Sequence, residues 1–326
     1  MRARRQLIIA LGASAITLPL NAFGQQQPAR VARVGWLSYL SDSDPGLIGL
    51  RGGMRDLGYV EGKSYSIVAR FANGDFARAP ILVDELATER VDIIVTRGPT
   101  AIYTIPIRSR IPIVFAFSGD PVEAGFADSL SRPGHNMTGI TFMATELSAK
   151  RVEVLKETIP AASRIALLSN PGHAGELSEY RVTEEAARRL GATTRRYVVR
   201  TPQELVAAFT TISADHPDAM IVFPDALTLE HRKDIAEFAA RARIPCVYGW
   251  TEFADVGGLL SYGPTVNDSW KTLAAFVDKV LKGADASNIP IEQEKKITLT
   301  LNLAAAKALG LKVPQSIVAR ADKLIE

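Results

Sequence analysis

The sequence is poor in the residues that build disulfides and metal sites. It contains one cysteine, Cys246, and four histidines among 326 residues. A single cysteine cannot form an internal disulfide, and its position in the apolar run Ile244–Tyr248 predicts a buried strand residue that packs as a small hydrophobe. No two histidines have the spacing of metal ligands, so we expect no metal site, and we expect the histidines on the surface or in loops. They are His135, His173, His216 and His231.

An excess of positive charge is also absent once the first residues are set aside. The formal net charge is +3, and residues 1–24 contain three arginines and no acidic residue, so the rest of the chain has a net charge of zero. A protein that binds nucleic acid needs a basic surface that displaces counterions. We therefore expect no nucleic-acid partner.

Long apolar runs are limited to the N-terminus. Arg2, Arg4 and Arg5 precede the mostly apolar stretch Leu7–Leu20, which at 14 residues is too short to span a bilayer. Ala22–Gly24 then has small residues in the pattern of a cleavage site. We predict that residues 1–24 are a signal peptide that directs export to the periplasm and is removed. An anchoring helix that is never cleaved is the alternative.

The same segment bears on the route of export and on membrane attachment. The adjacent arginines Arg4 and Arg5 resemble a twin-arginine signal, so the route stays open. The segment contains no cysteine, so we do not expect a lipoprotein. No later run reaches 18 apolar residues, and we expect no insertion into a membrane after cleavage.

The rest of the chain is rich in short apolar runs separated by longer amphipathic segments. This alternation is typical of βαβ units, and the lack of polar alternation within the runs indicates parallel sheets covered by helices on both faces. About 300 residues predict two domains. The expected strands are Val31–Ser38, Tyr65–Phe71, Asp92–Thr96, Ile111–Phe117, Arg164–Ser169, Thr194–Val199, Ala219–Phe223 and Ile244–Tyr248. The expected helices include Ala77–Arg90, Leu147–Thr158, Glu179–Leu190, Pro202–Ser213 and Leu229–Arg243.

The two halves of the chain share features at a constant separation of 133 residues. These are the helix-ending glycines Gly58 and Gly191, the strand-opening residues Ile111 and Ile244, and the glycines Gly125 and Gly258. We therefore predict an α/β fold of two similar Rossmann-like lobes, each with a parallel sheet, joined by several crossing strands that act as a hinge.

The crossing points set the expected lobe boundaries. The chain is expected to cross near Phe142–Glu146 and to return at Tyr262–Asn267. The first lobe is then residues 30–143 plus about 266–290, which includes a helix at Ser269–Leu281. The second lobe is residues 144–265 plus about 291–326, completed by the tail Lys295–Glu326.

Motifs for nucleotide binding and nucleophilic catalysis are missing. Gly58–Ser64 resembles a P-loop but is one residue short, with a helix before it and a strand after it, the reverse of the P-loop order. No G-x-G-x-x-G follows a strand, no G-x-S-x-G elbow is present, and Cys246 lacks the positive surroundings that activate a thiolate. We predict no cofactor and no enzyme activity, although an acid–base pair of distant carboxylates stays open.

Polar, turn-rich segments follow the predicted strands, at the sheet edge where open parallel sheets bind ligands. In Thr96–Thr100 the glycine permits close backbone approach, and N–H groups and hydroxyls at a helix start would hold a carboxylate. Asp120, Asp225 and Glu252 would accept hydrogen bonds from an ammonium or hydroxyl group of a ligand.

Two aromatic residues complete this predicted site. Tyr39 and Trp250 would clamp an apolar body from opposite lobes. Whether Arg97 faces the cleft or solvent is left open. The predicted ligand-binding residues are Ser38, Tyr39, Ser41, Asp42, Thr96, Gly98, Thr100, Ser118, Asp120, Asn170, Asp225, Trp250 and Glu252.

Several stretches have the character of a known family. They are Glu252–Gly263, Leu57–Gly62, Ile111–Phe115 with Gly119–Val122, Ser131–Gly134, and Leu301–Leu311 with Ala321–Asp322. In these the sequence closely resembles the periplasmic substrate-binding proteins of ABC transporters, in the family that includes tryptophan- and phenylalanine-binding members. The resemblance covers essentially all of the chain after the signal.

The resemblance implies a type I periplasmic binding protein that closes on its ligand, without catalytic residues, and that works with a membrane permease and its ATPase. In amino-acid-binding members we look for a run rich in Thr, Asp and Asn after the strand Ala219–Phe223. Here Pro224–Thr228 keeps Asp225 but little else. Aromatic acids, other carboxylates and modified amino acids all remain open as ligands.

Three functions are therefore carried forward. The first is capture of a small molecule for import by a monomer. The second is a periplasmic module that presents its ligand to a membrane receptor. The third is an exported enzyme that uses Asp120, Asp225 or Glu252 as acid and base.

Overall fold

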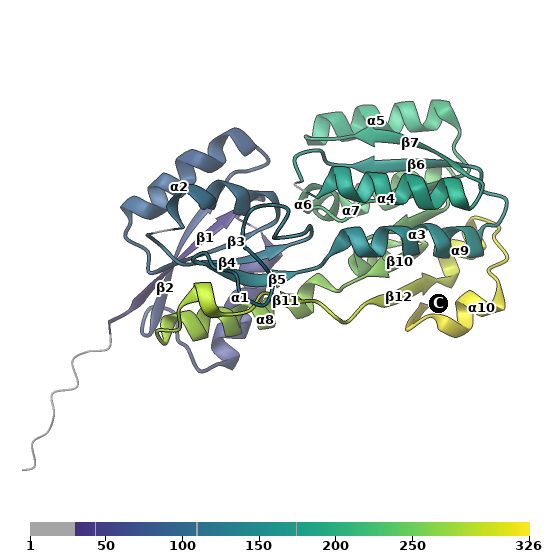
Figure 1. Ribbon diagram of the computed structural model, residues 1–326. Helices are drawn as coiled ribbons and strands as arrows, with labels where there is room; N and C mark the ends of the chain where they lie inside the picture. The colour runs from purple at the N-terminus through teal and green to yellow at the C-terminus, as the bar shows by residue number, and fades with distance from the viewer. Residues whose placement is uncertain (1–29, 43, 109, 174) are drawn as a thin grey trace, which may run out of the picture. The chain divides into compact units, whose positions relative to one another are not determined.

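The computed structural model describes residues 30–326 except 43, 109 and 174, and the side chains of 267 and 268 are also not described (Figure 1). The described elements belong to one compact unit, Val31–Glu326. The predicted signal peptide lies outside the described residues. Within the described chain, no helix combines the length and apolarity needed to cross a bilayer.

The first sheet has six parallel strands in the order β11-β5-β4-β3-β1-β2. The strands are β1 (Ala32–Ser38), β2 (Tyr65–Phe71), β3 (Ile93–Arg97), β4 (Ile113–Phe117), β5 (Met137–Thr141) and β11 (Glu292–Gln293). The α-helices beside it are α1 (Pro45–Asp56), α2 (Ala79–Thr88) and α8 (Val266–Leu281), and the 3₁₀ segments are η1 (Phe76–Arg78), η2 (Gly98–Ile107) and η4 (Ala286–Asn288). We call this sheet and these helices the first lobe.

Both faces of the first sheet are buried, which explains the apolar character of its strands. On β1, Trp36 belongs to the buried cluster that contains residues of α1 and α8, such as Leu50 and Leu273. The next residue, Leu37, belongs to a separate cluster with Val83 of α2. Successive strand residues point to opposite faces, so helices must cover both sides of the sheet.

The second sheet has seven strands in the order β13-β12-β10-β9-β8-β6-β7. Strands β10 and β12 pair antiparallel, and the other described pairs in this sheet are parallel. The strands are β6 (Arg164–Ser169), β7 (Thr193–Val198), β8 (Ala219–Val222), β9 (Cys246–Tyr248), β10 (Leu260–Gly263), β12 (Thr298–Asn302) and β13 (Lys323–Ile325). We call this sheet and its helices the second lobe.

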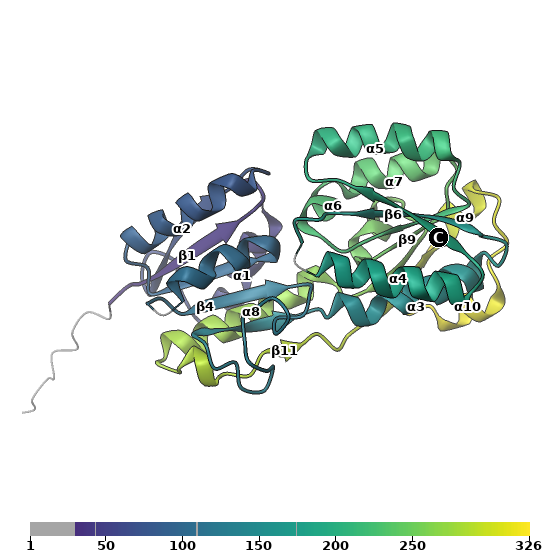
Figure 2. The ribbon, with the colours of Figure 1, turned by 45° about the horizontal axis from the view of Figure 1, so that its top comes forward.

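Helices again cover both faces of the second sheet. In Figure 2, α3 and α4 lie along one side of the sheet and α5 and α7 along the other. The buried clusters agree, because Leu167 of β6 packs with α3 residues and Leu168 with α5 and α7 residues. The helical segments are α3 (Ala144–Thr158), α4 (Glu176–Arg189), α5 (Pro202–Asp215), α6 (Ala226–Glu230), α7 (Arg232–Arg241), η3 (Thr251–Val256), α9 (Leu303–Ala308) and α10 (Gln315–Arg320).

The two sheets repeat one strand order. Strands β2-β1-β3-β4-β5 of the first sheet correspond to β7-β6-β8-β9-β10 of the second. Gly58 and Gly191 both have positive φ, 87° and 71°, and each follows the cap of a helix. The sequence pairs Gly125 with Gly258, but the structure shifts this correspondence by one residue. Gly125 has φ 74°, and the glycine with a similar conformation in the second lobe is Gly257, with φ 95°. The α/β fold of two similar lobes is confirmed.

Three segments connect the sheets, at residues 142–143, 264–265 and 294–297. The predicted helix at Leu229–Arg243 is wrong in detail, because it is two helices, α6 and α7, separated at His231. A capping box between Asp225 and Thr228 starts α6 three residues earlier than expected. Strand β11 keeps the returning chain in the first sheet as far as Gln293.

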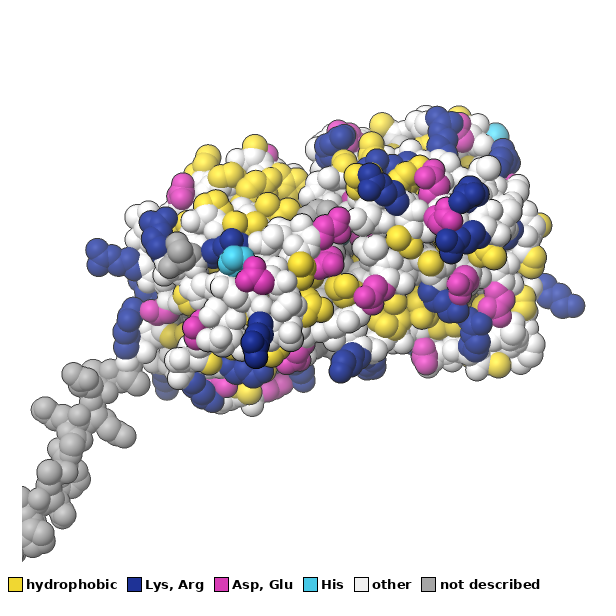
Figure 3. Space-filling view, in the orientation of Figure 1, with side chains coloured by type: hydrophobic (Ala, Val, Ile, Leu, Met, Phe, Trp, Pro, Cys, Tyr) yellow, Lys and Arg dark blue, Asp and Glu magenta, His cyan; other side chains and the backbone are white. Residues whose placement is uncertain are grey.

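Figure 3 shows one face of the molecule, on which cationic and anionic side chains are interspersed.

Cys246 is 1% exposed in β9, and burial raises the pKa of its thiol. It packs as a buried strand residue, as the sequence predicts.

Candidate ligand-binding site

A cavity lies between the two lobes at the carboxyl ends of their strands. Its volume is about 20 Å³, and its lining comes from Arg97, Gly98, Ala116, Ser118, Phe142, Val266 and Trp270 of the first lobe and from Ala226 and Trp250 of the second. This is the edge at which open parallel sheets bind ligands. Three predicted residues, Gly98, Ser118 and Trp250, are brought together here.

Arg97, whose direction the sequence left open, faces this cavity. It ends β3 and is 5% exposed. Its Nη1 donates to Oδ1 of Asp44 at 2.7 Å, and its guanidinium carbon lies 5.1 Å from the centroid of the Trp270 ring. Asp44 caps α1, where it also accepts from the Gly46 N–H at 2.8 Å and from the Ser38 hydroxyl at 2.6 Å. The ion pair is therefore built into the start of a helix.

Two threonine hydroxyl groups, one on each side of Arg97, bond to each other and to the backbone. Thr96 and Thr100 are buried, and their hydroxyl oxygens lie 3.0 Å apart. Thr100 also donates to the Arg97 carbonyl at 2.6 Å. These two hydroxyls therefore stabilise the junction of β3 and η2 and do not line the cavity. Gly98 has φ 56°, a conformation that favours glycine, and it faces Ala226 of the second lobe.

The two aromatic residues predicted as a clamp lie in different surroundings. Trp250 lines the cavity, packs edge-on against Phe142 with ring centroids 5.1 Å apart, and donates from Nε1 to the Asp225 carbonyl. Tyr39 stacks on Phe76 at 4.0 Å, and its hydroxyl donates to the Arg200 carbonyl at 3.1 Å. Tyr39 thus joins the lobes away from the cavity lining.

The three predicted acids make caps. Asp120 accepts from the Val122 N–H at 2.8 Å, and Glu252 accepts from the Val266 N–H at 2.8 Å. Asp225 is 3% exposed, and its Oδ1 accepts from the Leu227 N–H and from Asn170 Nδ2. Its other oxygen, Oδ2, is buried without a hydrogen-bond partner among the described residues.

Ser41 and Asp42 lie outside the small cavity. Ser41 lines a wider cavity of about 260 Å³ that is formed with Asp44 of the first lobe and Leu229, Glu230 and Arg232 of the second. Asp42 is exposed. The interface between the lobes therefore contains a narrow aromatic cavity and a broader polar one. Asp44 lines the broader cavity and accepts a hydrogen bond from Arg97, which lines the narrow one.

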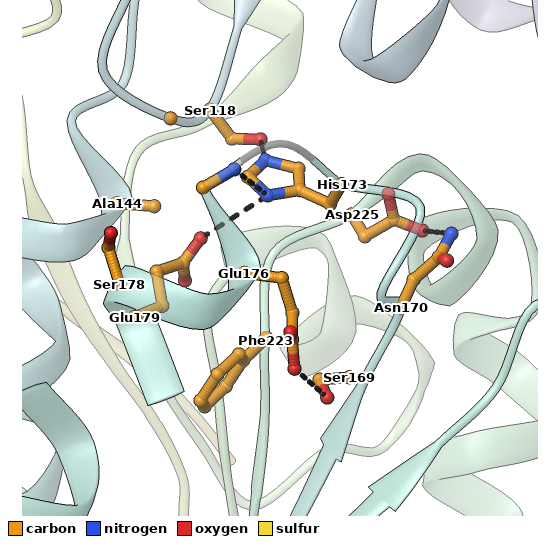
Figure 4. A network of polar contacts seen from close by, with 12 residues as sticks. Ser118, Ala144, Ser169, Asn170, His173, Glu176, Ser178, Glu179, Phe223 and Asp225 are labelled. Carbon is orange, nitrogen blue, oxygen red and sulfur yellow. Dashed lines mark hydrogen bonds and ion pairs between the residues drawn. The ribbon is translucent and has the colours of Figure 1, made fainter. Parts of the chain in front are cut away.

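His173 forms a contact between the lobes that the sequence did not indicate (Figure 4). The residue is 4% exposed, so the expectation of a surface or loop histidine is wrong for its burial. Its Nδ1 accepts from the Gly175 N–H at 3.1 Å, which leaves the Nε2–H to donate to the Ser118 hydroxyl. Its ring stacks on Phe117. Burial lowers the pKa of His173 and so favours the neutral form.

Beneath His173 lie two buried ionisable groups, Arg151 of α3 and Glu179 of α4. Their nearest charged atoms are 3.9 Å apart, and neither oxygen of Glu179 has a hydrogen-bond partner among the described residues. Burial raises the pKa of Glu179 to about 8 and lowers that of Arg151 to about 10. Glu176, one turn earlier, instead accepts from Ser169 at 2.5 Å and from Arg196 at 2.7 Å.

In the described part of the chain, no three His, Cys, Asp or Glu side chains come together as metal ligands. The side chains at the seam instead offer a guanidinium, hydroxyl groups and aromatic rings around one cavity. Two Rossmann-like lobes with such a cavity between their strand ends define the class of this protein, which has the type I periplasmic binding protein fold.

The chain belongs to the family of ABC transporter substrate-binding proteins, whose pattern matches residues 43–325. A tyrosine-binding protein of Clostridioides difficile is 22% identical over 260 residues, which cover 79% of this chain and 74% of that protein. Two solved structures are similar over 90% of this chain and 100% of theirs. One is an ABC domain in complex with L-Trp from Streptococcus pneumoniae, with a TM-score of 0.81 and 22% identity. The other is a conserved domain protein from Vibrio cholerae, with a TM-score of 0.82 and 25% identity.

Proposed function

We propose that this protein is the solute-binding component of an ABC importer, which captures a small molecule between its lobes and delivers it to a permease with its ATPase. The cavity shared by the strand ends of both lobes supports this most directly. Membership of a family of ABC transporter substrate-binding proteins supports the transport role. Binding instead of catalysis fits the acids Asp120 and Glu252, because both cap backbone N–H groups.

The ligand class that we propose is an amino acid, an aromatic acid or another carboxylate. Phe142, Trp250 and Trp270 supply aromatic surface to the cavity, and Arg97 supplies positive charge. Relatives named for tyrosine, or solved with L-Trp, support a ligand with an aromatic ring.

Binding requires the lobes to move. A cavity of about 20 Å³ holds about one water molecule, whereas pockets for small-molecule ligands are about 300–1,000 Å³. The connections at residues 142–143, 264–265 and 294–297 would act as the hinge. A ligand that contacts both lobes favours the closed arrangement, and its differential affinity sets the population shift.

The place of action that we propose is the periplasm, with residues 1–24 as the export signal and the protein acting as a monomer. Substrate-binding proteins of this family are typically extracytoplasmic. A fusion of residues 1–30 to a reporter tests the signal, since it should export the reporter and be shortened by cleavage.

The main test is a thermal-shift screen of the purified protein with amino acids, aromatic acids and neutral sugars. A ligand at about a hundred times its dissociation constant adds roughly 2.7 kcal/mol to the free energy of unfolding. Trp250→Ala should weaken that ligand about tenfold or more, because it removes an aromatic wall of the cavity. If no compound shifts the melting temperature, solute capture by this cavity is refuted.

Delivery needs a second experiment. Proteoliposomes that contain the permease and its ATPase should import the identified ligand only when this protein is added. Import that is equally fast without it would refute the transport role while leaving ligand binding intact.

A further inference from the structure

The guanidinium group of Arg97 is the charged group in the lining of the small interlobe cavity. The other eight lining residues are neutral, and Arg97 itself is 5% exposed. A cation withdrawn from water beside aromatic rings is costly unless other groups compensate it. The character of those compensating groups decides what else the guanidinium can bind.

Two contacts fix the orientation of the guanidinium group. Nη1 donates to Asp44 Oδ1 at 2.7 Å, and the group lies over the Trp270 ring at 5.1 Å. Asp44 is held in turn by the Ser38 hydroxyl and by the Gly46 N–H. Because the side chain is already ordered, little conformational entropy is lost when a ligand binds to it.

The contact with Asp44 uses one of the five N–H donors of the guanidinium. Among the described residues, the guanidinium of Arg97 forms no further hydrogen bond to the protein, and the side chain lines the cavity. A planar fork of N–H groups matches the two oxygens of a carboxylate, which it binds in a bidentate manner.

Asp44 does not cancel the attraction of Arg97 for a second anion. Its negative charge is shared with the Ser38 hydroxyl and with the N-terminus of the 12-residue helix α1, where partial positive charge accumulates. A carboxylate bonded to the free side of Arg97 is separated from Asp44 by the width of the guanidinium. Coulomb energy falls with distance, so the attraction exceeds the repulsion.

The walls of the cavity define the rest of the ligand. The ring planes of Phe142 and Trp250 form an angle of 89°, and the Arg97 guanidinium lies over the ring of Trp270. Such surfaces pack against a flat aromatic body through stacked and edge-on contacts. Ser118 adds a hydroxyl group to the same lining.

We propose that Arg97 binds the carboxylate of a ligand whose body is a flat aromatic ring, and that it thereby selects carboxylates over neutral molecules of the same shape. This inference rests on the proposed solute-binding function and narrows its ligand class. Asp44 is the positioning residue that keeps the guanidinium in place.

The first measurement is isothermal titration calorimetry of the wild-type protein with matched pairs. The probes are 4-hydroxybenzoate, 3-phenylpropanoate and L-tyrosine, each beside its primary amide, with neutral sugars as a further arm. At least one carboxylate should bind, and its amide should bind about 10- to 100-fold more weakly, as expected for loss of a charged hydrogen bond.

The second measurement uses variants of the ion pair. Arg97→Gln alone leaves Asp44 buried without its cation and is expected to fold poorly. The double variant Asp44→Asn with Arg97→Gln removes both charges, and asparagine is also a good helix cap. It should fold, lose about 10- to 100-fold in carboxylate affinity, and bind acid and amide equally. Asp44→Asn alone removes the anion that positions Arg97, so carboxylate affinity should fall while the preference for the acid over its amide remains.

Arg33→Gln is the matched control. Arg33 lies near the opposite, amino end of β1 in the same sheet, where it bonds Glu89. This variant should retain wild-type affinity and the preference for carboxylates.

The outcomes separate this inference from the proposed function. Equal binding of acid and amide by wild type, or a preference that survives in the double variant, overturns the role of Arg97. If only neutral sugars bind, solute capture stands and the carboxylate inference fails. If no probe or library compound binds, both fail.

Discussion

The buried carboxyl group of Glu179 leads to a prediction about stability as a function of pH. Burial raises its pKa from 4.5 to about 8 in the folded protein. In the unfolded chain the group ionises near its ordinary value. Because the folded-state pKa is raised, the proton on Glu179 increases the free energy of unfolding. This stabilisation is fully present below pH 4.5 and is lost as the pH rises through about 8. The wild-type protein should therefore lose stability across this window.

The expected magnitude follows from the size of the shift. Each pKa unit corresponds to about 1.4 kcal/mol, so between pH 4.5 and pH 7 this group lowers the free energy of unfolding by about 3 kcal/mol. Glu179→Gln keeps the shape of the protonated acid but cannot ionise. The variant should match wild type near pH 5 and exceed it in stability at pH 9.

Urea unfolding, followed by the fluorescence of the buried tryptophans at pH 5, 7 and 9, measures this difference. Glu185→Gln is the control, since Glu185 lies on the same helix but forms exposed ion pairs with Arg188 and Arg189. The control should change stability by well under 1 kcal/mol and keep the wild-type slope. Parallel curves for wild type and Glu179→Gln would show that Glu179 is not protonated in the folded state.

Three further predictions concern the interface between the lobes and the buried core. Ser118→Ala leaves the buried His173 N–H without its acceptor in the contact between the lobes, beside the cavity that Ser118 lines. Calorimetry should therefore show about tenfold weaker ligand binding. Ser178→Ala removes an exposed bond to Glu123 and should change the affinity less than about threefold; equal effects of both changes would contradict the importance of burial. Gly98→Ala should lower the free energy of unfolding by about 1–2 kcal/mol because φ is 56°, and an unchanged urea midpoint would be incompatible with that conformation. Cys246 should react with a thiol reagent only in urea, since it is buried and its pKa is raised; rapid labelling of the native protein would contradict this.

The strands that the sequence shows most clearly are those with long apolar runs. Tyr65–Phe71 and Arg164–Ser169 have the bounds predicted for them. Strands β5 and β10 were not predicted, because Met137–Thr141 and Leu260–Gly263 are short and contain threonine, serine or glycine. Their strand character comes from pairing with neighbouring strands, which is tertiary information.

The site was predictable to the level of its loops but not of its side chains. The loops after β3, β4 and β9 do meet at one cavity, as the rule for parallel sheets requires. The direction of Arg97 depends on Asp44, 53 residues away, and the burial of His173 depends on Ser118, 55 residues away. Tyr39 bonds a carbonyl 161 residues away. Such partners have no local signature in the sequence.

The position of α8 in the chain has a consequence for synthesis and folding. This helix packs on α1 and on the first sheet, where Trp270 meets Trp36 and Asp278 accepts a hydrogen bond from Tyr59. More than two hundred residues separate these partners, so the part of this face that α8 covers stays exposed until residues 266–281 have been synthesised. Contacts of such high sequence separation fold slowly and expose apolar surface in the meantime. A nascent chain that ends at Gly263 should therefore need a chaperone, and the first lobe cannot be produced as a contiguous N-terminal fragment.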